Sequence, residues 1–246
     1  MDYAIWRLVK SSMRGQREPS RGGWTFQTFW IWLMEVLIQR QLLALSFTRW
    51  IIHMLIFWGF ISLGVLSFFL VFLLLAEISG IDGGLRAYFL YGSGHALVKV
   101  WGDFFGLCLL LGLLAASFRR VVNKSSQLVS DQSDFILLAY LLWLALSGFF
   151  LEGLRLSQVP ASVSHYSFVG RFFALPWTVN SPNINLWLTV LWSVHAFSGL
   201  GLLVYLPKSK LVHSFFGPVV IAMNASEEKE RKDIYWPKVK DHRPIK

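Results

Sequence analysis

Four long apolar runs constrain this chain of 246 residues more than any other feature of its sequence. Each run has about 20 residues, the length that an α-helix needs to cross ~30 Å of hydrocarbon at ~1.5 Å per residue. The runs cover residues 51–76, 95–118, 134–152 and 184–206. A composition of 55% hydrophobic residues is also unusual for a soluble domain. The sequence therefore predicts an all-α, multi-pass membrane protein with a bundle of four transmembrane helices.

Lysine and arginine are unevenly distributed among the segments outside these runs. Residues 1–50 hold seven of them, the 119–133 loop holds three and the chain from residue 207 holds nine, whereas the other two loops together hold three. By the positive-inside rule, we expect both termini and the middle loop on the cytoplasmic side of the cell membrane. The net charge of +9 therefore reflects topology and not nucleic-acid binding.

Residues 24–47 are apolar enough to suggest a fifth crossing. Polar side chains interrupt this run at Glu35, Gln39, Arg40 and Gln41. A fifth crossing would also place the basic N-terminus outside, against the charge distribution. We therefore expect an amphipathic, aromatic-rich helix on the cytoplasmic face of the membrane.

Four of the six histidines fall at membrane positions. His53 lies at the cytoplasmic entrance of the first span and His95 at the outer start of the second. His195 lies in the outer half of the last span, and His213 at its cytoplasmic end. On a continuous helix, the 18 residues between His195 and His213 make five turns and ~27 Å, so both would point to one side near opposite membrane faces. Depth then pairs His53 with His213 and His95 with His195.

Two such pairs are what two bis-histidine haems require, since each iron takes one imidazole nitrogen from either face. Each histidine could instead hydrogen-bond a neighbouring helix, bind a transported metal or relay protons. The scarcity of carboxylates argues against the last two, because only Asp103, Asp134 and Glu152 lie near span ends.

The segment HAFSGLGLLVYLPKSKLVH, residues 195–213, resembles the last transmembrane helix of the gamma subunit of respiratory nitrate reductase. That family also has two haem-ligating histidines 18 residues apart, with a Pro-x-Ser-Lys/Arg-Leu-Val-His ending. RWIIHMLIFWGF (49–60) and GDFFGLCLLLGLL (102–114) are similar to the b-type cytochrome subunits of membrane heterodisulfide reductases and their sulfate-respiration relatives. The resemblance covers about residues 35–218.

The resemblance implies a haem b on the cytoplasmic side with His53 and His213 as axial ligands. It makes His195 one ligand of a second haem b on the outer side. The family takes its fourth ligand ten residues after the first, where this chain has Leu63, which cannot ligate iron.

His95 is the best substitute for that fourth ligand by depth. His165, in the outer loop 153–183, is the second choice, and a protein with a single haem is the alternative.

Lys99 and Asp103 follow His95 by one and two helical turns. Similar subunits bind quinol beside the outer haem, where a lysine near this helix start takes part. Quinol oxidation sheds protons, so a hydrogen-bonding group is needed near the ring. Lys99 could instead extend its charge to the membrane interface. Glu152 and Arg155 either extend this pocket or form an interfacial ion pair.

We expect a dihaem cytochrome b subunit that carries electrons between membrane quinone (menaquinone or another quinone) and a cytoplasmic iron–sulfur partner of a respiratory complex. The partner is needed because Cys108 is the only cysteine, too few for clusters of its own. The alternative is a haem-free transporter or assembly scaffold with structural histidines. The expected organisation is a cytoplasmic N-terminus (1–50), a haem-binding membrane domain (51–213) and a cytoplasmic tail (214–246).

Overall fold

Four long apolar helices dominate the structure, which is a computed structural model describing residues 26–81, 83–122, 132–158, 164–175 and 183–227. Within these ranges the chain forms helices and no strand. Four helices are long and apolar enough to cross a membrane, which confirms the predicted all-α fold with four spans. They are α4 (Phe47–Ile78), α6 (His95–Val122), α7 (Gln132–Leu156) and α9 (Ile184–Tyr205).

The apolar segment before the first span forms two short helices. They are α2 (Phe26–Leu37), with 12 residues, and α3 (Arg40–Leu45), with 6. Neither approaches the roughly 20 residues that a crossing needs. The break falls at Gln39, whose φ of 52° lies in the left-handed region that ends regular helices. Of the polar residues that interrupt the run in the sequence, Gln39 is the one at the break, whereas Glu35 lies within α2 and Arg40 and Gln41 lie within α3.

The chain divides into two compact units, residues 46–209 and residues 1–45 with 210–246. In the second of these units, α2 packs on α10 (His213–Glu227), and the Trp32 indole N–H donates to the Pro218 carbonyl over 2.7 Å. The helix α10 continues to Glu227. The expected cytoplasmic tail from residue 214 was not predicted to contain a helix. The basic N-terminus (1–25) and the charged end (228–246) lie outside the described residues.

The last span does not continue as one helix to His213, as the sequence argument assumed. The helix α9 ends at Tyr205, and two short 3₁₀ turns, η2 (Leu206–Lys208) and η3 (Lys210–Val212), come before α10. Pro207 lacks a backbone N–H and crowds the preceding turn, and Ser209 has an extended backbone with ψ of 164°. The shared direction of His195 and His213 therefore does not follow from helical spacing.

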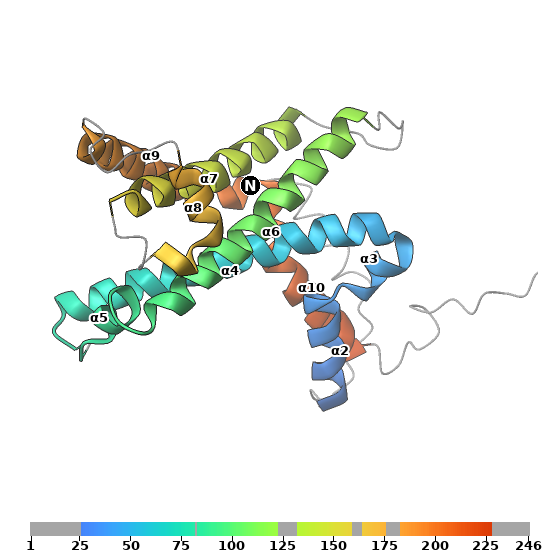
Figure 1. Cartoon of the computed structure of the whole chain (residues 1–246). Helices are drawn as coiled ribbons and strands as arrows, with labels where there is room; N and C mark the ends of the chain where they lie inside the picture. The colour runs from blue at the N-terminus through green and yellow to red at the C-terminus, as the bar shows by residue number, and fades with distance from the viewer. Residues whose placement is uncertain (1–25, 82, 123–131, 159–163, 176–182, 228–246) are drawn as a thin grey trace, which may run out of the picture. The chain divides into compact units, whose positions relative to one another are not determined.

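The spans of the larger unit pack in chain order, α4 on α6, α6 on α7 and α7 on α9 (Figure 1). The connection from α4 to α6 holds α5 (Leu85–Leu90), which contacts both helices. The connection from α7 to α9 holds η1 (Ser164–Tyr166) and α8 (Phe168–Ala174). The helix α8 packs on α7, and the rings of Phe173 and Phe149 stack with centroids 5.4 Å apart. The loop residues are thus part of the packed unit.

Glycines set the close approach of α4 and α6. A Cβ on Gly59 would lie 2.7 Å from the backbone nitrogen of Leu109, and a Cβ on Gly112 would lie 2.9 Å from the Cβ of Leu55. Both distances are shorter than van der Waals contact, so only glycine permits this approach. Small residues play the same part in membrane helix pairs generally, because lipid offers no hydrophobic drive and close contact supplies the attraction.

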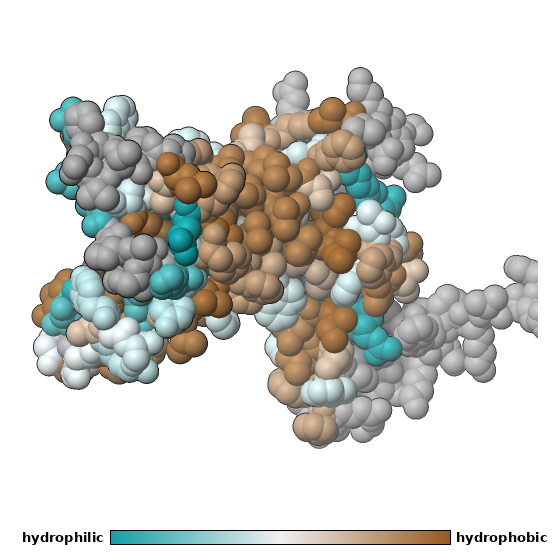
Figure 2. All heavy atoms as spheres, viewed as in Figure 1, coloured by the Kyte–Doolittle hydropathy of each residue, from teal (hydrophilic) through white to brown (hydrophobic). Residues whose placement is uncertain are grey.

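Large apolar side chains cover the outside of this unit. Phe68, Phe197 and Val204 are 65%, 73% and 79% exposed. Figure 2 shows hydrophobic residues across the face of the long helices that it presents. An apolar surface of this extent suits contact with lipid and not with water. The helix surface therefore agrees with the four predicted membrane spans.

We predict that Gly59→Ala lowers the stability of the detergent-solubilised protein by about 1–3 kcal/mol, because the added methyl group forces α4 and α6 apart. Gly64→Ala is the matched control on the same helix, since a Cβ there meets no atom within 4 Å. Thermal unfolding followed by circular dichroism checks both variants. Equal midpoints for the two variants would show that the α4–α6 contact is not tight.

Candidate functional site

A cavity of about 290 Å³ lies among the four long helices of the larger unit. Its walls are mostly apolar, and polar side chains gather on α6 and α7. The lining residues are Leu63, Leu66, Ser67, Leu70, Val98, Lys99, Gly102, Asp103, Gly106, Leu144, Ala145, Gly148, Phe149, Glu152 and His195. An apolar pocket with a few convergent polar groups is the usual form of a ligand site.

His195 reaches this cavity from α9 and is held by α7. Its Nδ1 lies 2.8 Å from the Ser147 Oγ, and that hydroxyl lies 3.2 Å from the Leu144 carbonyl oxygen. A carbonyl oxygen can only accept, so the hydroxyl donates to Leu144 and accepts from Nδ1–H. Such an arrangement leaves Nε2 unprotonated and able to bind a metal, and a hydrogen bond on the other nitrogen is the normal support of a metal-binding histidine.

The ring of His195 lies directly against the backbone of Gly148. A Cβ on Gly148 would lie 3.4 Å from the Cε1 and 4.0 Å from the Nε2 of that ring. Gly102, Gly106 and Gly148 all line the cavity. A Cβ on Gly106 would meet the Phe149 ring at 2.8 Å and one on Gly102 would meet Leu66 at 3.7 Å, so Gly148 is the glycine of the three that lies next to the His195 ring.

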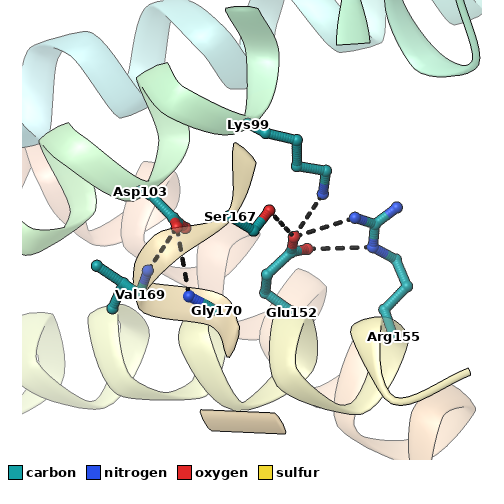
Figure 3. Close-up of polar contacts among 7 residues, drawn as sticks. All are labelled: Lys99, Asp103, Glu152, Arg155, Ser167, Val169 and Gly170. Carbon is teal, nitrogen blue, oxygen red and sulfur yellow. Dashed lines mark hydrogen bonds and ion pairs between the residues drawn. The ribbon is translucent and has the colours of Figure 1, made fainter. Parts of the chain in front are cut away.

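Polar side chains converge on the Glu152 carboxylate at the end of the bundle where α6 begins (Figure 3). Its Oε1 accepts from the Lys99 Nζ at 2.6 Å, the Arg155 Nη2 at 3.0 Å and the Ser167 Oγ at 3.0 Å. Its Oε2 accepts from the Arg155 Nε at 3.1 Å. We call Lys99, Asp103, Glu152, Arg155 and Ser167 the polar cluster. The charges of Lys99, Glu152 and Arg155 are paired with one another, as buried charges must be.

Asp103 holds α8 onto α6. Its Oδ2 accepts the backbone N–H groups of Val169 at 2.7 Å and Gly170 at 3.3 Å, in the first turn of α8 (Figure 3). The side chain is almost completely buried, with 4% of the residue exposed. These N–H groups have no partner within their own helix, so a carboxylate satisfies them and favours the helix start. Asp103 thus connects the cavity wall to the α7–α9 connection.

His95 lies one helical turn before Lys99, at the start of α6. Its Nδ1 is buried and has no hydrogen-bond partner among the described residues, and its ring lies within electrostatic range of Glu152. His95 does not line the cavity that His195 enters. The structure therefore brings His95 near the polar cluster and leaves it outside the walls around His195.

His53 and His213 lie in different compact units. His53 is half-buried on α4 and stacks on Phe57 with ring centroids 6.3 Å apart. The Nδ1 of His213 contacts the Lys210 carbonyl oxygen, which can only accept, so Nδ1 is the donor in this contact. His165, the second choice for the fourth ligand, is exposed in η1.

Sequence reasoning found His195, Lys99 and Asp103, which the structure brings to one cavity. It missed the roles of Ser147 and Ser167. Ser147 stands 48 residues from His195 along the chain, so no local spacing indicates that the two meet. In the sequence, the only indication of a role for Ser167 is its position just before an apolar stretch, where a hydroxyl often precedes a helix. Within the described ranges, no three His, Cys, Asp or Glu side chains form a metal site of their own.

The family model described as nitrate reductase gamma subunit matches residues 85–226, more than half of the chain. The chain belongs to the nitrate reductase gamma subunit family. The matched region contains His95, His195 and His213, together with the whole polar cluster, whereas His53 lies before it.

Curated proteins that are similar to this chain are named as oxidoreductases or as subunits of oxidoreductases. One subunit of the dihydromethanophenazine:CoB–CoM heterodisulfide reductase of Methanosarcina acetivorans is 27% identical over 80% of this chain and 66% of its own length. The subunit of the same name from Methanosarcina barkeri is 26% identical over 80% of this chain and 67% of its own length. The chain thus spans about two thirds of the length of these relatives.

The EtfAB:quinone oxidoreductase of Syntrophomonas wolfei is 22% identical over 87% of this chain, but this match covers only 30% of that longer protein. No solved structure matches the chain.

We predict that Asp103→Ala loosens α8 in this gamma-subunit family member. Hydrogen bonds to a charged group contribute about 1.5–3 kcal/mol each. Amide exchange of Val169 and Gly170 should therefore accelerate at least about tenfold, since 1.4 kcal/mol corresponds to a factor of ten. Hydrogen exchange with mass spectrometry of peptides covering 164–175 measures this. Asp134→Ala is the control, because Asp134 pairs with Arg120 at 3.6 Å in the first turn of α7. Unchanged exchange in Asp103→Ala would show that the carboxylate does not hold α8.

Proposed function

We propose that this protein is a dihaem b-type cytochrome subunit that transfers electrons between membrane quinone and a cytoplasmic iron–sulfur partner subunit. The observation that carries the proposal is His195, whose Nδ1 is held by Ser147 and whose Nε2 lies beside a cavity with glycine walls. Membership of the gamma-subunit family and relatives named as oxidoreductases support it. The haems would supply one-electron chemistry, and the protein would set their potentials through ligands and burial.

For the cytoplasmic-side haem, we propose His53 and His213 as the axial ligands. The Nδ1–H of His213 is directed to the Lys210 carbonyl, the kind of hydrogen bond that supports a metal-binding histidine. His53 stands in the first turns of α4, next to the aromatic ring of Phe57.

For the other haem, we propose His195 with His95 as the second ligand. The Nδ1 of His195 is held by Ser147, and His95 has a buried ring nitrogen that no group in the described part of the chain satisfies. Leu63 lines the cavity of His195 at the position where the resemblance expects a histidine. Because an apolar side chain cannot ligate iron, we propose His95 of α6 as the second ligand.

We propose that quinone, menaquinone or another, binds where the cavity meets the polar cluster. Lys99 and Asp103 both line the cavity there, and each is engaged by a neighbour, Lys99 by Glu152 and Asp103 by α8. Fixed polar groups in an apolar pocket orient a ligand without having to reorganise when it binds. In the proposed topology, this end of the bundle faces away from the cytoplasm and both termini face the cytoplasm.

The first test concerns the cytoplasmic-side haem. His53→Ala and His213→Ala should each remove one and the same haem and retain the other, since a bis-histidine iron needs both bonds. Reduced-minus-oxidised visible spectra of the purified variants measure this, with His165→Ala as a control that keeps both signals. Loss of different haems in the two variants would contradict the pairing. A featureless spectrum of the unaltered protein would contradict haem binding altogether and favour the haem-free scaffold.

A second test addresses the other haem. His95→Ala and His195→Ala should abolish the same low-spin signal, which the His53 and His213 variants retain. Electron paramagnetic resonance of the oxidised proteins distinguishes low-spin from high-spin iron. Two low-spin haems in His95→Ala would remove His95 from the ligands and place it with Lys99 in the quinone pocket.

A further inference from the structure

Quinol oxidation releases two electrons and two protons. In the function proposed above, on which this inference rests, the electrons pass through the haems to the iron–sulfur partner. The protons need a base that can touch the quinol hydroxyl groups. Several polar groups line the cavity, and each has a different capacity to accept a proton.

Most of these groups are unsuited to that task. The Lys99 ammonium has only donors, and the Ser67 hydroxyl is a weak base. The proposed role of His195 occupies its Nε2. Asp103 is 4% exposed and its carboxylate holds the first N–H groups of α8, so it is sealed from water, which a proton relay must reach. Glu152 is the group that remains.

We propose that Glu152 is a catalytic residue that accepts a proton from bound quinol at its Oε2. A carboxylate offers about four positions for donors. Three donors occupy Oε1, from Lys99, Arg155 and Ser167. Only the Arg155 Nε binds Oε2, so this oxygen has room for the quinol hydroxyl. The transfer breaks the quinol O–H bond and forms a carboxylic acid O–H bond.

The surrounding charges favour onward release of this proton. Lys99 and Arg155 carry positive charge, and Asp103 and Glu152 carry negative charge, so these four side chains sum to zero before the transfer and to +1 after it. The quinol anion balances this charge until its electrons leave for the haems, and from then on the +1 is unbalanced. His95 also lies within range of Glu152, and Tyr91 within range of Arg155. A surplus positive charge in an apolar medium is unfavourable. Glu152 therefore holds the proton only briefly.

Exposure indicates where the proton leaves. The side chains of Lys99 and Glu152 are 13% and 19% exposed, whereas that of Arg155 is 42% exposed. Arg155, which contacts both oxygens of the carboxylate, is thus the most exposed of these three side chains and the point where water meets them. The guanidinium itself stays protonated, so the acceptor on this side is water.

Glu152→Gln tests the proposal, because glutamine keeps the shape and a carbonyl acceptor for Lys99 and Ser167 but cannot take up a proton. The probe is menadiol, with haem reduction followed in a stopped-flow spectrometer. We expect the saturated rate to fall about 10²–10⁴-fold, the usual contribution of a general base. The half-saturating menadiol concentration and the haem spectrum should stay unchanged. Glu77→Gln is the matched control, since Glu77 pairs with Arg86 at the end of α4, outside the cavity.

A saturated rate like that of the unaltered protein would overturn the proposal. So would a raised half-saturating concentration with an unchanged saturated rate, because that result assigns Glu152 to binding alone. If Glu152→Gln does not assemble haem, Glu152→Asp decides, and an unchanged saturated rate with this withdrawn carboxylate overturns the proposal. Failure of menadiol to reduce haem in the unaltered protein would instead overturn the proposed function.

Discussion

Polar groups inside the apolar bundle must find partners within the protein, because lipid offers none. This constraint organises the larger unit. The Glu152 carboxylate combines donors from α6, α7 and the residue before α8, and Asp103 satisfies the first N–H groups of α8. These bonds fix the α7–α9 connection onto the spans at one end. They also gather charge at the wall of a cavity whose remaining surface is apolar.

The same constraint explains why His195 is held so specifically. Its Nδ1 is satisfied through Ser147, which is 1% exposed, and the hydroxyl is in turn satisfied by the Leu144 carbonyl. Nδ1 is thereby bound by the protein, and Nε2 is left next to the cavity. Gly148 lies next to the ring, where a Cβ would be in van der Waals contact with it. Gly102 and Gly106 line the same cavity on α6.

The histidine pattern illustrates how far spacing along the chain can be used. The positions of all four histidines near span ends or inside spans followed from the apolar runs, and family membership agrees with the resemblance drawn from residues 195–213. The 18-residue spacing did not translate into one helical face, because Pro207 ends α9 and His213 begins a new helix. Depth pairing grouped His95 with His195, and this pairing stays a prediction. The walls of the cavity that His195 enters include Leu63, Gly148 and residues up to three turns beyond His95 on α6.

By itself, the sequence determined the number of spans, because a span depends on the hydropathy of about 20 consecutive residues. It also determined the interruption at Gln39, because that residue is one of the polar residues within an otherwise apolar run. It also brought forward His195, Lys99 and Asp103 as site residues. Only the tertiary structure decided that Ser147 holds His195, that Asp103 holds α8 and that Glu152 connects Lys99, Arg155 and Ser167. Most of these contacts join residues from 15 to 67 positions apart. Such pairs are fixed by helix packing, which the glycines of α4, α6 and α7 permit and local periodicity does not encode.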